Sequence, residues 1–168
     1  MSKTQKLARI SVLVAMATTL HTLESVCLPP VFPGARIGLA NIITLIAIIL
    51  FGTKVGVVVV ILRGILTTML RGTIVGFILG TSGGIVAAIV MGMVYKIGRR
   101  LFSFVGISII GAVANSLTQV VVAYFVLIKH PGCFYLVPLF LLSSLITGFF
   151  NGVVVSYLDK HLKFYGGD

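Results

Sequence analysis

The stretch from Arg63 to Gly92, RGILTTMLRGTIVGFILGTSGGIVAAIVMG, contains the two features that decide the fold. Two arginines, Arg63 and Arg71, lie in very apolar sequence, and an arginine at the centre of a membrane span costs roughly 3 kcal/mol on insertion scales. Small residues recur at every fourth position, which lets helix backbones approach closely: Gly72, Gly76, Gly80, Gly84, Ala88 and Gly92. Together these features predict a tightly packed helical bundle around a positively charged, partly buried site. In the alternative interpretation, Arg71 is an interfacial anchor and the glycines serve packing alone.

The composition of the whole chain is that of a polytopic membrane protein. Of its 168 residues, 58% are hydrophobic and only 10% are charged, whereas soluble domains carry about 25% charged residues. The net charge of +10 does not indicate nucleic acid binding, because no soluble basic face is available to contact phosphates. We expect a single integral membrane domain over residues 1–168, in the cell membrane of a bacterium.

Six hydrophobic segments follow one another, and each is expected to form a transmembrane helix. Their approximate bounds are 7–22, 37–51, 55–70, 74–95, 104–128 and 136–157. The apolar run is nearly continuous through 71–73, where we expect a helix break. The loop CLPPVFPGAR holds three prolines, which exclude a regular helix there. The predicted fold class is therefore all-α, a membrane bundle of six transmembrane helices.

The distribution of basic residues predicts that both termini are cytoplasmic, an N-in/C-in topology. With the N-terminus inside, nine basic residues are cytoplasmic: Lys3, Lys6, Arg9, Lys54, Lys96, Arg99, Arg100, Lys160 and Lys163. Three lie outside, namely Arg36, Arg71 and Lys129, and Arg63 lies within the membrane.

Arg63, Thr67 and Arg71 are spaced four residues apart and share one helix face. The chain has only three acidic residues: Glu24, Asp159 and Asp168. Two of these are cytoplasmic in the predicted topology, so Glu24 is the one nearby candidate for an ion pair with Arg63. The scarcity of acids favours an anionic ligand, or an acid of a partner subunit, as the counter-charge, since guanidinium groups bind carboxylate and phosphate well.

Other polar residues inside the predicted spans are structural bridges or ligand contacts, and the sequence leaves both open. Asn115 and Gln119 lie one turn apart at a depth similar to that of Arg63, and Asn41 follows Arg36 at the outer end of the second helix. On the sixth helix the stripe is Ser143, Thr147 and Asn151, where hydroxyls are expected to bond their own helix backbone.

The first helix carries a face of small residues formed by Ser11, Ala15 and Thr19. This face either packs inside the bundle or docks on another membrane subunit. Catalytic and metal-binding motifs are not found: no paired carboxylates, Asp-rich motif or Walker A motif is present. We therefore expect no independent enzyme activity, no metal and no cofactor. A disulfide between Cys27 and Cys133, both expected in outward loops, is an open alternative.

Four blocks of sequence resemble the Gx transporter family, which is also known as heptaprenyl diphosphate synthase component I. They are FPGARIGLANIITLIAIILFG, LRGILTTMLRGT, LGTSGGIVAAIVM and VGISIIGAVANSLTQ, and the resemblance covers about residues 7–155. The family often has a histidine before the asparagine of the fifth helix, whereas this chain has Ala114 there.

The chain is also similar in size and helix number to the S components of energy-coupling-factor (ECF) transporters. That resemblance implies a subunit that captures a vitamin-like substrate from outside and docks, through small residues of its first helix, on a transmembrane subunit driven by two ATPases. Here the docking face would be Ser11, Ala15 and Thr19, a departure from the alanine pattern of that family.

Three functions follow as hypotheses. The leading one is a substrate-capture subunit for a small anionic or phosphate-bearing molecule, vitamin-like or related to isoprenoids, quinones or flavins. Its expected ligand contacts are Arg36, Asn41, Arg63, Arg71, Asn115 and Gln119. The alternative is a non-catalytic membrane subunit of heptaprenyl diphosphate synthase, and the third is a small self-assembling channel. Membrane lipid surrounds the protein in each case.

Overall fold

The computed structural model describes residues 3–27, 38–98 and 101–165, and these form a bundle of helices. Within them the α-helices are α1 (Lys3–Cys27), α2 (Ala40–Phe51), α3 (Thr53–Arg71), α4 (Ile74–Gly98), α5 (Phe104–Ala123) and α6 (Val137–Tyr165). A π-helical turn, Tyr124–Ile128, follows α5, and a 3-10 helix, Pro131–Leu136, precedes α6. The all-helical fold with six α-helices is the one that the sequence predicts.

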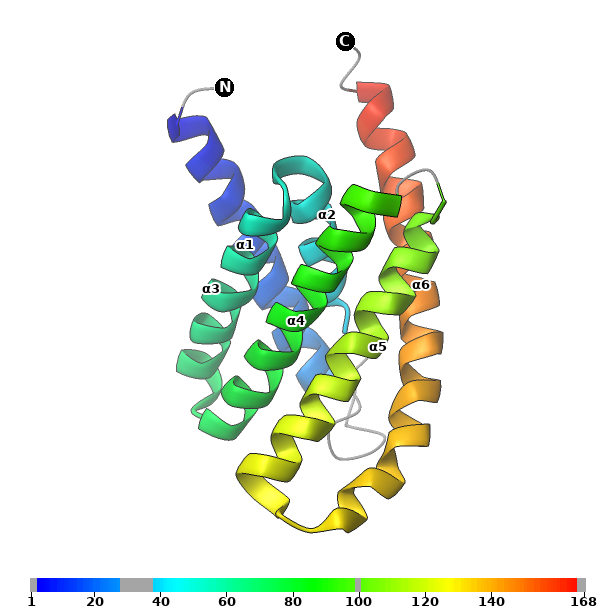
Figure 1. The fold of residues 1–168 in the computed structure, drawn as a ribbon. Coiled ribbons are helices and arrows are strands. Elements are labelled where there is room, and N and C mark those ends of the chain that lie inside the picture. Colours follow the sequence, from blue (N-terminus) through cyan, green and yellow to red (C-terminus); the bar gives the residue numbers. More distant parts are fainter. Residues whose placement is uncertain (1–2, 28–37, 99–100, 166–168) are drawn as a thin grey trace.

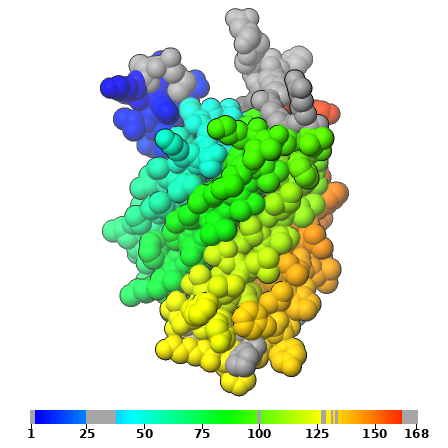
Figure 2. Space-filling view, in the orientation of Figure 1, coloured from blue at the N-terminus to red at the C-terminus, as the bar shows by residue number. Residues whose placement is uncertain are grey.

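The helices run alternately up and down, so that α1 starts and α6 finishes at the same end of the bundle (Figure 1). We call this the terminal end and the other the distal end. The order around the bundle is α1, α3, α4, α5 and α6, because each neighbouring pair is in contact. The short helix α2 lies among them and contacts all five. Figure 2 shows α3, α4 and α5 as adjacent bands over one face of the molecule.

Four helical stretches of the described part are long and apolar enough to cross a membrane: Thr53–Arg71, Ile74–Gly98, Phe104–Val126 and Phe134–His161. By contrast, α2 has only 12 residues, which gives a length of about 18 Å against a hydrocarbon core of about 30 Å. It is apolar and largely buried. Leu45 and Ile48 of α2 lie in the main hydrophobic core with Val60, Met91 and Ile107 of its neighbours.

The helix bounds differ from the predicted ones where no residue marks a boundary. α1 and α6 extend beyond the predicted ranges, to Lys3–Cys27 and Val137–Tyr165. The segment DKHLKFY, expected as a tail, continues α6 because it contains no proline or glycine. The predicted fifth helix is divided at Ala123, where the hydrogen-bonding pattern becomes that of a π-helix.

The predicted break between α3 and α4 is confirmed. Gly72 adopts a left-handed conformation with φ 67°, and its N–H donates to the Thr68 carbonyl at 2.7 Å. A glycine in this conformation is a common end for a helix, because a side chain there would be strained.

The glycines of α4 face two neighbouring helices, α3 and α5. A Cβ atom at Gly84 would lie 2.7 Å from Cγ1 of Val60 on α3, and one at Gly92 would collide with Thr53 of α3. Gly83, by contrast, faces Asn115 on α5. The spacing of small residues therefore packs α4 closely against α3, as the sequence predicts.

The α5–α6 interface is closer still. A Cβ atom at Gly148 would lie 2.7 Å from the Cα of Ile109, and one at Gly152 would collide with the Cα of Val105. The hydroxyl groups of Ser116 and Ser144 form a hydrogen bond of 2.5 Å across this interface. The backbones of these two helices are thus in direct contact.

Candidate functional site

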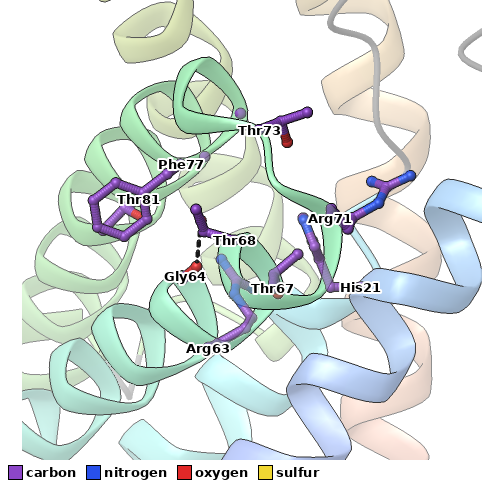
Figure 3. A pocket seen from close by; sticks show the side chains of 11 residues that line it. His21, Arg63, Gly64, Thr67, Thr68, Arg71, Thr73, Phe77 and Thr81 are labelled. Atoms are coloured by element: carbon purple, nitrogen blue, oxygen red, sulfur yellow. Dashed lines mark hydrogen bonds between the residues drawn. The ribbon is translucent and has the colours of Figure 1, made fainter.

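A polar pocket lies between α1, α3 and α4 in the distal half of the bundle (Figure 3). It is lined by His21 of α1, by Arg63, Gly64, Thr67, Thr68 and Arg71 of α3, and by Thr73, Gly76, Phe77, Gly80 and Thr81 of the α3–α4 turn and α4. Its free volume is about 20 Å³, and a single buried water needs roughly 10–15 Å³ on this measure. The pocket therefore has room for a compact chemical group.

α3 carries both arginines to this pocket. Arg63 lies ten residues from Thr53 and eight from Arg71, so it is near the middle of the helix. Its side chain is only 5% exposed, whereas Arg71 is exposed at the distal end. The rise between the two arginines is about 12 Å along the axis. The face that the sequence predicts is present, with one arginine deep and the other near the rim.

The guanidinium of Arg63 lies against the glycine face of α4. A Cβ atom at Gly84 would be 3.1 Å from its Nη2 atom. Two further glycines of the same face, Gly76 and Gly80, line the pocket. The absence of side chains at these positions leaves space beside α4 for the long side chain of Arg63.

Two hydroxyl groups in the pocket are buried without a hydrogen-bond partner in the described part of the chain. They are the Oγ1 atoms of Thr67 and Thr81, and the two residues are 8% and 9% exposed. Threonines elsewhere in the bundle bond their own helix: the Thr18 hydroxyl donates to Val14 at 2.8 Å and that of Thr118 to Ala114 at 2.8 Å. A buried unsatisfied polar group costs about 1–3 kcal/mol, so the two hydroxyls indicate a polar occupant.

The combination of a deep guanidinium and two hydroxyls is suited to an anion. Arginine offers a planar fork of N–H donors that matches an oxyanion, and each hydroxyl offers one more donor. No acidic residue is among those that line the described pocket.

Asn115 and Gln119 lie on α5, away from the pocket that holds the arginines. The Gln119 side-chain amide donates to Oδ1 of Asn115 at 3.2 Å, and both side chains pack on Gly83 of α4. α3 and α5 each contact α4 but do not contact one another within the described residues. Arg63 and Asn115 lie against adjacent residues of α4, Gly84 and Gly83, from the α3 and α5 sides.

Asn41 lies in a third polar group, at the start of α2. The carboxylate of Glu24 accepts hydrogen bonds from the N–H groups of Gly38, at 2.6 Å, and Leu39, at 3.0 Å. The side chain of Asn151 on α6 donates to the Gly38 carbonyl at 3.0 Å, and the Asn41 side chain lies beside Gly38. This buried carboxylate, considered above as a partner for Arg63, is bonded to the N-terminus of α2.

The small-residue face of α1 points away from the bundle. Ser11, Ala15 and Thr19 are exposed, whereas Val14 and Ala17 are buried. The hydroxyl of Thr19 donates to the Ala15 carbonyl at 3.0 Å. The exposure of all three residues disagrees with internal packing, the alternative considered for this face.

Some sequence predictions fall outside the described residues. These are the role of Arg36, the loop 28–37 and the side chains of Cys27 and Cys133, so the role of Arg36 and the disulfide stay predictions. Among the residues that the structure describes, no group of three or more His, Cys, Asp or Glu side chains could hold a metal ion.

His21 and Thr81 are among the pocket residues that the sequence did not single out. One helix, α2, separates His21 from Arg63 in the chain, and Thr81 follows a glycine of the α4 stripe. Thr81 lies in the face of α4 that packs on α3, at Gly64. Neither residue carried a signal in the sequence, because the position of each in the pocket depends on how separate helices pack.

The fold is that of a known class of membrane protein. The solved structure of the S component of a bacterial ECF transporter aligns with a TM-score of 0.80 and 22% sequence identity, covering 99% of this chain and 100% of that one. The chain belongs to the family described as heptaprenyl diphosphate synthase component I, whose profile matches residues 13–158. No curated protein matches the sequence.

Proposed function

We propose that this protein is the substrate-binding membrane subunit of an ECF-type uptake transporter and that it captures a small anionic or phosphate-bearing molecule. The observation that carries the proposal is the 5% exposed Arg63, halfway along an apolar helix and beside two buried hydroxyls without partners. Ionisable residues inside the membrane are costly and usually mark a substrate path. The S-component fold supports the same assignment.

The proposed orientation has six spans, both termini in the cytoplasm and the pocket in the outer half of the cell membrane. Basic residues are concentrated at the terminal end of the described chain, which favours this orientation: Lys3, Lys6, Arg9, Lys54, Lys96 and Lys160. Only Arg71 and Lys129 lie at the distal end of the described part. Substrate then enters from outside.

The substrate is vitamin-like or related to isoprenoids, quinones or flavins in this proposal. Arg63 and Arg71 neutralise its anionic group, and Arg36 adds to this charge. Because the free volume between α3 and α4 is only about 20 Å³, the bulk of a substrate lies outside that pocket. Asn41, Asn115 and Gln119 are the proposed hydrogen-bonding contacts for this remaining part.

The first test is retention of a ligand by the purified protein, measured by native mass spectrometry, together with uptake by cells. Arg63→Ala is expected to lower ligand affinity roughly 100-fold, because truncating one partner of a buried charged pair costs several kcal/mol. Arg63→Lys keeps the charge but not the fork and should lose roughly tenfold. Lys54→Ala, at the terminal end, is the matched control with unchanged binding. Intact uptake in Arg63→Ala cells, with no small molecule retained by the wild-type protein, would disprove the proposal.

Docking on a transmembrane coupling subunit with its ATPases is assigned to the exposed face of Ser11, Ala15 and Thr19. Ala15→Leu is expected to abolish co-purification of the ATPases while leaving the thermal stability unchanged, because position 15 is exposed. Val153→Leu on the exposed surface of α6 is the control. Equal recovery of ATPases with both variants would exclude docking through α1.

The family description favours a second candidate, a non-catalytic membrane subunit of heptaprenyl diphosphate synthase. In that case a prenyl chain lies between the helices and its diphosphate lies at the arginines. The magnesium-binding carboxylates of such chemistry belong to another subunit, because this chain has only three acidic residues. Co-purification of a soluble prenyltransferase instead of ATPases would support this candidate.

A further inference from the structure

We propose that the pocket between α3 and α4 is a phosphate subsite in which Thr67 and Thr81 select a phosphate group over a carboxylate. The inference rests on the proposed substrate-binding function and adds two binding residues and a ligand class to it. It is carried by the convergence of the Arg63 guanidinium with two unpartnered hydroxyls that are 8% and 9% exposed.

The donors reach the pocket from two helices. Arg63 and Thr67 are one turn apart on α3, and Thr81 lines the same pocket from α4, where its Oγ1 is in contact range of the Gly64 position of α3. An oxyanion in this pocket is therefore approached from at least two directions. This arrangement differs from a single arginine fork, which presents its donors in one plane.

A carboxylate and a phosphate use such donors differently. A carboxylate has two oxygens, an arginine fork uses one lone pair of each, and the lone pairs that remain lie in the same plane. A phosphate monoester has three terminal acceptor oxygens in a tetrahedral arrangement. It can bind the fork with two oxygens and still accept hydrogen bonds from hydroxyls outside that plane. A phosphate is therefore better placed than a carboxylate to bond Thr67 and Thr81 together with Arg63.

The charge of the pocket favours the same ligand. A phosphate monoester carries about −1.5 to −2 charges at neutral pH, and the pocket is lined by Arg63 and Arg71 with no acidic residue among the described lining residues. The free volume of about 20 Å³ corresponds to one or two waters, so a phosphate enters only when the side chains that line the pocket shift. The phosphate thus lies at the deep arginine and the remainder of the molecule lies outside.

The test compares butyl phosphate with pentanoate, two ligands of matched chain, by isothermal titration of the purified full chain in lipid nanodiscs. We expect butyl phosphate to bind at least about tenfold more tightly. Thr67→Val and Thr81→Val should each weaken butyl phosphate about tenfold, because one charge-assisted hydrogen bond is lost, and should leave pentanoate unchanged. Equal affinities for both ligands, or wild-type affinity in both valine variants, would overturn the proposal.

Matched variants separate binding from folding. Thr67→Ser and Thr81→Ser retain the hydroxyl and should retain the preference for phosphate. Thr118→Val is the control, because the Thr118 hydroxyl bonds its own helix at 2.8 Å. A loss of preference in the serine variants equal to that in the valine variants would show that packing, and not the hydroxyl, is responsible.

The phosphate can come from a soluble substrate or from a phospholipid headgroup, and native mass spectrometry distinguishes the two. A retained phospholipid that is lost in Thr67→Val and Thr81→Val supports the phosphate subsite and contradicts substrate capture at this pocket. Uptake of a substrate without phosphate that depends on Arg63 but not on the two threonines has the opposite meaning: the proposed function stands and the phosphate subsite is wrong.

Discussion

The α3–α4 and α5–α6 interfaces both depend on glycine, but the glycines contact side chains in the first interface and backbone in the second. In α6, Gly148 and Gly152 meet the backbone of α5 at Ile109 and Val105. In α4, Gly84 meets the side chains of Val60 and Arg63. A backbone contact is rigid and joins two helices, whereas a contact with the end of an arginine side chain can yield.

The polar groups of the two interfaces differ in the same way. Between α5 and α6 the hydroxyl of Ser144 donates to the Phe140 carbonyl at 2.6 Å and pairs with Ser116 at 2.5 Å. Between α3 and α4 the hydroxyls of Thr67 and Thr81 have no partner in the described chain. The comparison teaches that one interface is complete by itself and maintains the fold, while the other is incomplete and suited to a ligand.

The largest expected effect is that of Gly152→Ala. The added Cβ meets the Val105 Cα and lies 3.1 Å from the Phe104 carbonyl oxygen. These are backbone atoms that cannot move without separating the helices, so we expect a loss of about 3 kcal/mol in the free energy of unfolding. Denaturation of the purified protein, followed by circular dichroism, measures this loss. A stability equal to wild type would show that α5 and α6 are not held by close backbone contact.

Gly84→Ala is expected to have a smaller effect on stability and a larger one on binding. Its Cβ lies 2.7 Å from the Val60 side chain and 3.1 Å from Nη2 of Arg63. Both contacts are with side-chain atoms, which can shift more easily than a backbone, so the loss of stability should be about 1 kcal/mol. Displacement of the guanidinium should weaken binding of an anionic ligand about tenfold. The same denaturation experiment and a ligand titration test both parts, and a larger stability loss than in Gly152→Ala would reverse the ranking of the two interfaces.

The smallest expected effect is that of Ser144→Ala. It removes one hydroxyl pair between α5 and α6, and interhelical hydrogen bonds in membranes contribute about 0.6 kcal/mol on average. Ligand affinity should not change, because position 144 does not line the pocket. Thr118→Val, whose hydroxyl bonds only its own helix, is the comparison for loss of a hydroxyl without loss of an interhelical bond. Weaker ligand binding in Ser144→Ala would connect the two interfaces.

The sequence predicted the parts of the fold that depend on local sequence. Apolar runs indicated the six helices, and Gly72 was correctly placed at the break between α3 and α4. The ends of α1 and α6 were not predicted, because they pass through polar sequence that lacks a helix-breaking residue. Helix length there depends on continued backbone hydrogen bonding, which hydropathy does not report.

The candidate site, like the fold, was predicted only in part. The spacing of Arg63, Thr67 and Arg71 predicted the side of the pocket that α3 forms, because residues four apart share a helix face. The opposite wall depends on the relative heights of separate helices, which no local pattern encodes, so His21 and Thr81 were missed. For the same reason the sequence left Asn115 and Gln119 open between a structural bridge and a ligand contact, and in the structure they pair with one another on α5.

The bond between Asn151 and Gly38 fixes an order of events in biosynthesis. The two residues are 113 positions apart in the chain. At elongation rates of about 5–20 residues per second, the second helix waits roughly 6–20 s for the partner that completes its start. Glu24 is made before α2, so its carboxylate is available to the N–H groups of Gly38 and Leu39 during that interval. The acidic residue of α1 is therefore in place to stabilise the start of the short helix α2 before the last helix is made.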